Sequence, residues 1–93
     1  MLVEFAGVQL YASIHRLGRA LSESTDREGV EQMMLSAMTD SALDDFNRLV
    51  FAYLYLNMSH YLPDENLKAK NLKTLESTLA QMPKHLSEGF EIE

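Results

Sequence analysis

The chain contains no cysteine, only two prolines and only four glycines. Without cysteine, disulfide scaffolds, thiol nucleophiles and cysteine-ligated zinc sites are excluded. The scarcity of proline and glycine leaves little material for turns and disfavours an all-β fold. Basic residues are also few, because 8 Lys and Arg stand against 14 Asp and Glu and give a net charge of −6. An acidic chain repels phosphate backbones, so direct binding to nucleic acid is disfavoured.

Long hydrophobic runs are absent as well. The longest apolar run is LVFAYLYL, from Leu49 to Leu56, whereas a helix needs about 20 apolar residues to cross a bilayer. At the N-terminus Glu4 precedes the first cation, Arg16, which is unlike the basic start of a signal peptide. We therefore expect a cytoplasmic protein that makes no membrane contact.

The hydrophobic residues that are present follow helical spacing. The chain has 93 residues, of which 46% are hydrophobic, enough for the core of one small domain. Apolar periodicity and breaks predict helices near residues 2–21, 26–38, 41–62 and 64–81. This pattern predicts an all-α domain resembling a four-helix bundle, with three long helices and a short second one. We place the domain at residues 1–82 and expect residues 83–93 to form an acidic C-terminal tail.

Local signals set the expected helix starts. Thr25 with Glu28 three residues later forms a capping box for the second helix. Ser41, with Asp44 in the first turn, is the expected cap of the third. In the first helix Gly7 lies within the apolar stripe and indicates a close helix crossing.

The third helix is the most informative element because it is apolar almost all round. On a helical wheel its apolar arc spans about 260°, against about 100° for a surface helix, which predicts a central, buried position. One face collects Leu43, Phe46, Val50, Tyr53, Leu54, Asn57 and Tyr61. A narrow polar strip contains Asp45, Arg48, Ala52 and Ser59.

The first and third helices together carry more apolar surface than the other helices can be expected to cover. Either all these faces close within one protomer, or one face binds a partner, because monomers seldom expose large apolar patches. We favour the second interpretation, with the protein itself as partner in a homodimer. The expected interface residues are Phe5, Val8, Ala12, Phe51, Tyr55, Met58 and Leu62.

No group of residues marks an enzyme. The histidines His15, His60 and His85 lie on different segments, without the HExxH or ExxH spacing of metal sites. Phosphate-binding glycine loops and the GxSxG and SxxK signatures of nucleophilic hydrolases are absent. We expect no cofactor, no metal and no small-molecule substrate. The sequence favours a regulator, inhibitor or accessory subunit that acts by protein–protein association.

An acidic segment supports an alternative function. Between Glu23 and Asp45 lie seven acidic residues and one cation, Arg27, so this segment alone carries the charge of the whole chain. Capping and solvation explain much of this charge. The alternative is an acidic surface that imitates nucleic acid, as in a phage or mobile-element inhibitor of a nucleic-acid-binding host complex. Its candidate residues are Glu23, Asp26, Glu31 and Asp40.

A third hypothesis comes from the run His15-Arg16-Leu17-Gly18-Arg19. It resembles the histidine phosphotransfer domains, small helical bundles whose exposed histidine is followed by a basic residue and then a glycine. Here the glycine comes before the second basic residue, so the order is reversed, and the resemblance covers these five residues only. It implies a phosphorylatable His15.

Overall fold

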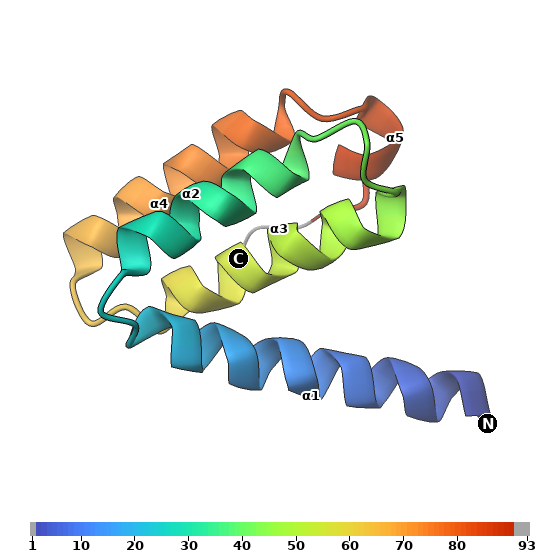
Figure 1. Ribbon diagram of the computed structural model, residues 1–93, viewed down its shortest axis with the longest axis horizontal. Helices are drawn as coiled ribbons and strands as arrows, with labels where there is room; N and C mark the ends of the chain where they lie inside the picture. Colours follow the sequence, from blue (N-terminus) through green and yellow to red (C-terminus); the bar gives the residue numbers. More distant parts are fainter. Residues whose placement is uncertain (1, 91–93) are drawn as a thin grey trace.

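The computed structural model (Figure 1) describes the backbone of residues 2–90 and the side chains of residues 12–90. Within residues 2–90 all regular secondary structure is helical, which confirms the predicted all-α class. The helices are α1 (Leu2–Ser22), α2 (Arg27–Met38), α3 (Asp45–His60), α4 (Glu65–Leu79) and α5 (Lys84–Ser87). The first four lie close to the predicted ranges, whereas the sequence pattern did not indicate α5.

Three of the helices begin at an aspartate. Asp26, Asp44 and Asp64 are the N-caps of α2, α3 and α4, and each carboxylate accepts a hydrogen bond from the first turn of its helix. Asp26, rather than the predicted Thr25, caps α2 and accepts from the N–H of Gly29 at 3.3 Å. A Cβ at Gly29 would lie 2.4 Å from a carboxylate oxygen of Asp26, so the glycine makes room for this cap.

The start of α3 also differs from the expectation. The carboxylate of Asp40 accepts a hydrogen bond from the N–H of Ala42 at 2.9 Å and holds the chain in a turn. Ser41 therefore lies in the loop and is not the cap, and α3 begins only after Asp44. The aspartates near the helix starts are thus used mainly as local caps.

The core is built around α3, which contacts α1, α2 and α4. In Figure 1, α3 lies between α1 on one side and α2 with α4 on the other. The central position predicted for the third helix agrees with these contacts. The buried apolar residues are Ile14, Met34, Met38, Ala52, Leu54, Tyr55, Leu56, Met58, Leu62, Leu75, Leu79, Met82 and Leu86.

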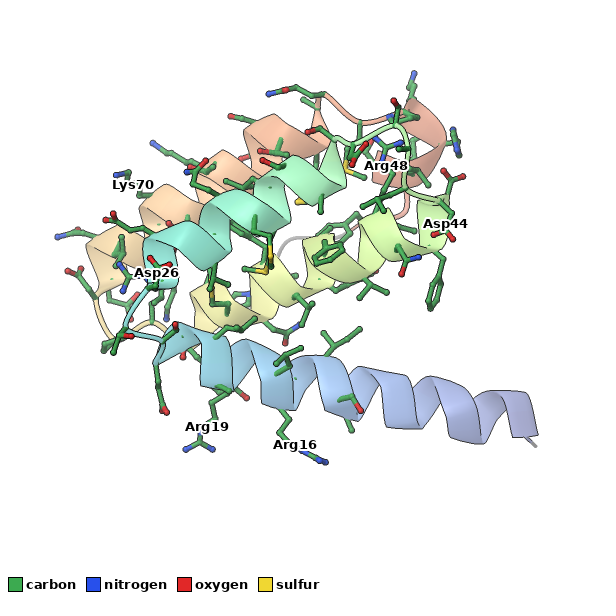
Figure 2. The ribbon with its side chains drawn as sticks, viewed as in Figure 1. Arg16, Arg19, Asp26, Asp44, Arg48 and Lys70 are labelled. Carbon is green, nitrogen blue, oxygen red and sulfur yellow. The ribbon has the colours of Figure 1, made fainter. Side chains whose placement is uncertain are left out.

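The orientation of α3 about its own axis is the main correction. Three residues of the predicted polar strip face the core, since Arg48 is 7% exposed and Ala52 and Ser59 are 0% exposed, whereas Asp45 is exposed. The small side chains of Ala52 and Ser59 allow neighbouring helices to approach closely. The Nε–H of Arg48 donates to the carbonyl of Met38 at 2.8 Å, at the C-terminal end of α2, where the helix dipole favours a cation. Figure 2 shows Arg48 at this junction.

The predicted tail belongs in part to the folded domain. Leu86, in α5, is 6% exposed and joins the core, and Phe90 packs against it. The boundary placed at residue 82 is therefore wrong, because the packed region extends to Phe90. Residues 91–93 lie outside the described residues.

Candidate interaction surface

Three of the predicted interface residues lie in the core of the protomer. Tyr55 is 1% exposed, Met58 is 0% exposed and Leu62 is 2% exposed. The prediction that these side chains face a partner is wrong. The small residues of α3 face the core, and the neighbouring positions on either side of them are buried as well. Tyr55 and Met58 occupy such positions.

The other predicted interface residues have different outcomes. Phe51 is half-buried and packs against the core, and Ala12 is exposed on α1. The side chains of Phe5 and Val8 lie outside the described residues. An interface contribution from these four residues stays a prediction.

The surface that stands out is one side of α3. We define the outer face of α3 by Phe46, Val50, Tyr53 and Tyr61, whose spacing places them along one side of the helix. Phe46 is 61% exposed, Tyr53 37% and Tyr61 40%, and Val50 is half-buried between them. The wheel placed these residues on one face together with Leu54 and Asn57, which are buried at 7% and 8% exposure. Large side chains exposed along one stripe are typical of a binding surface.

The outer face of α3 carries no formal charge. Within α3 the Asp and Arg residues are Asp45 and Arg48. Arg48 is buried on the opposite side, and Asp45 accepts a hydrogen bond of 3.1 Å from His85 Nε2. On α1, Arg16 and Arg19 point away from the other helices (Figure 2). The outer face of α3 therefore lacks charged side chains, although the chain as a whole is acidic.

One end of the outer face is covered by α1. A Cβ at Gly18 would lie 2.7 Å from the Cβ of Asn57, so this glycine permits the close approach of α1 and α3. The crossing residue inferred from sequence was Gly7, which lies outside the described side chains. Nearby, His15 Nδ1 lies 3.0 Å from the hydroxyl of Tyr61, and the two rings meet edge to face. The histidine of the phosphotransfer resemblance is thus half-buried and hydrogen-bonded.

The middle of the outer face is touched by the C-terminal segment. The ring centroids of Tyr53 and Phe90 lie 4.4 Å apart with an interplanar angle of 37°. Phe46, nearer the start of α3, is left the most exposed of the stripe. The outer face is therefore open at one end and partly covered at the other.

A buried polar cluster joins α2, α3 and α4. Asn71 Nδ2 donates to Glu31 Oε1 at 2.8 Å, and Arg27 Nε lies 3.2 Å from the same oxygen. Burial, with the nearby Glu31 carboxylate, raises the pKa of Tyr55 to about 12, while a hydrogen bond with Thr74 opposes this shift. A phenol that holds its proton so firmly is a poor acid–base catalyst, so we interpret the cluster as structural.

The four residues of the acidic alternative are not gathered on one surface. Asp26 and Asp40 lie at opposite ends of α2, a distance of about 18 Å for a helix of this length. Glu31 is turned inward to Arg27 and Asn71. Glu23 is exposed beyond the end of α1. Asp26, Glu31 and Asp40 therefore make separate, local contacts.

A shallow hollow of about 620 Å³ lies along the outside of α4. Lys70, Lys73 and Ser77 are among the residues that line it, and all of them lie on α4 or just beyond its end. Small-molecule sites are usually enclosed by several elements. With one helix as its lining, this hollow has no opposing wall and is a weak candidate.

Other kinds of site find no support in the part of the chain that the structure describes. None of its helices combines the length and hydropathy needed to cross a membrane. Among the same residues, no group of three or more His, Asp or Glu side chains is placed to hold a metal ion. Comparisons of the chain with protein-family models, curated proteins and solved structures found no match. The functional argument therefore rests on the surfaces of this chain itself.

Proposed function

We propose that the protein is non-enzymatic and acts by protein–protein association, as a homodimer joined through the outer face of α3. It would serve as a regulator, inhibitor or accessory subunit in the cytoplasm. One observation carries the proposal: Phe46 is 61% and Tyr53 37% exposed on one side of α3, and Tyr61, beyond the point where α1 covers Asn57, is 40% exposed. Aromatic side chains of this kind dominate the centres of protein interfaces.

We choose a second copy of the chain as the occupant because the outer face of α3 carries no formal charge. Each protomer carries a net charge of −6, so two copies repel one another overall, and an uncharged contact surface adds the least to this repulsion. The outer face of α3 is such a surface, and two copies related by a twofold axis would bring the same stripe together. Salt should strengthen this association, because it screens the repulsion between the protomers. A basic partner would show the opposite dependence on salt.

The double variant Phe46→Ser/Tyr53→Ser tests the proposal. Both side chains are exposed, so the variant should keep its helical circular dichroism while losing self-association. Sedimentation equilibrium should give a dimer for the native chain and a monomer for the variant. Met33→Ser is the matched control, because Met33 is 55% exposed on α2 and should leave the dimer unchanged.

Sedimentation and partner capture, each at low and high salt, separate the alternatives. A native chain that is monomeric at millimolar concentration, at both low and high salt, would contradict self-association. Capture of a nucleic-acid-binding protein that weakens steeply as salt rises would instead support the acidic mimic. If Met33→Ser dissociates the dimer as well as the double variant does, the interface lies elsewhere.

A further inference from the structure

The C-terminal segment lies across part of the outer face of α3. We call residues 83–90 the strap. Leu86 is its buried anchor, at 6% exposure, and α5 forms a single short turn around it. Pro83 precedes α5 without a side-chain cap bond. Beyond Leu86 the strap reaches Tyr53 and sets the ring of Phe90 against it.

Beyond Leu86 the strap is held mainly by the packing of Phe90 against Tyr53 and the core. The N–H of Phe90 donates to the carbonyl of Ser87 at 3.2 Å, which is a bond within the strap. His85 meets Asp45, and both side chains are mostly exposed, at 67% and 59%. A Cβ at Gly89 would meet no atom within 4 Å, so the chain there is not packed against a neighbour. Release of Phe90 would give up its packing against Tyr53 and the core, whereas the Leu86 anchor is a separate contact.

We infer that the strap is an intramolecular competitor for the outer face of α3. Phe90 occupies, on the ring of Tyr53, the position that an aromatic side chain of a second copy must take to pack there. Only protomers with Phe90 released leave the Tyr53 ring open to a second copy, and a twofold dimer needs two such protomers, so the strap lowers the apparent association constant by the square of the released fraction. This inference rests on the proposed function and adds its regulation.

The variant Phe90→Ala tests the competition in the full chain. An aromatic pair of this kind changes the opening equilibrium of one protomer by about two- to tenfold, and because both protomers must open, the dimer dissociation constant should fall by up to the square of that factor in sedimentation equilibrium. Glu88→Gln is the control, because it changes the charge of the strap but leaves the ring of Phe90 in place. It should alter the dissociation constant far less than Phe90→Ala does.

A second measurement tests whether Phe90 covers the ring of Tyr53. Binding of the apolar dye anilinonaphthalene sulfonate to dilute protein should rise in Phe90→Ala and fall back in Phe90→Ala/Tyr53→Ser. A native chain that dimerises while Phe90→Ala dimerises equally or more weakly overturns the strap and leaves the proposed function standing. If neither chain dimerises, the proposed function and the competition both fail, and the dye still shows whether Phe90 covers Tyr53.

Discussion

The inner face of α3 carries Arg48, Ala52 and Ser59 and is buried, whereas its outer face carries Phe46 and Tyr53 and is exposed. The less apolar side is inside because small residues allow close helix packing and because Arg48 finds the free carbonyl at the end of α2. The more aromatic side is outside. In a helix that is apolar almost all round, side-chain size and local bonding set the orientation, and the leftover aromatic stripe becomes the candidate for function.

Two tyrosines of α3 test the difference between its inner and outer faces most strongly. Tyr55→Ala, on the buried side, should lower the free energy of unfolding by about 3–5 kcal/mol, because it empties a large core position. Tyr53→Ala, on the outer face, should cost about 1 kcal/mol, mainly the contact with Phe90. Urea denaturation at low protein concentration measures both. Equal costs would mean that the two sides of α3 are buried alike.

The next largest effect is a loss of folding stability at alkaline pH, which we attribute to Tyr55. Burial raises the pKa of Tyr55 to about 12, above about 10 in an unfolded chain. The folded state therefore keeps a proton that the unfolded state loses, so stability is intact below pH 10 and falls between about pH 10 and 12, by about 2–3 kcal/mol.

Thermal unfolding across this pH range should show a smaller fall for Tyr55→Phe than for the native chain. Tyr53→Phe is the matched control on the outer face and should keep the native fall. If Tyr55→Phe behaves as the native chain does, the hydroxyl of Tyr55 is not the group that loses stability.

The smallest expected effect is a gain. The hydroxyl of Ser59 is fully buried and makes no hydrogen bond, which costs stability. Ser59→Ala should raise the free energy of unfolding by about 1 kcal/mol. Ser77→Ala on the exposed side of α4 corrects for the helix propensity of alanine. A loss of stability in Ser59→Ala would show that the inner face depends on this hydroxyl.

Much of the fold could be predicted from the sequence, because periodicity and helix breaks are local signals. They located four helices and the central place of the third. The orientation of α3 could not be read in this way, since its wheel offers no single apolar face and the bond from Arg48 to Met38 is a tertiary contact. The packing of Leu86 was missed because α5 is too short to give a periodic apolar pattern.

The candidate site was predicted only in part. The sequence placed Phe46, Val50 and Tyr53 on one face without naming that face as an interface, and it placed Tyr55 and Met58 at an interface although they are buried. The excess of apolar surface was the useful signal. Which side of α3 remained uncovered depended on how the other helices packed.

The most direct test of self-association through the outer face of α3 is a nuclear Overhauser measurement on a mixture of isotope-labelled and unlabelled copies. The account predicts contacts between copies at the rings of Phe46 and Tyr53. A dimer whose contacts between copies involve Met33 or Leu17, and neither of these rings, would contradict it.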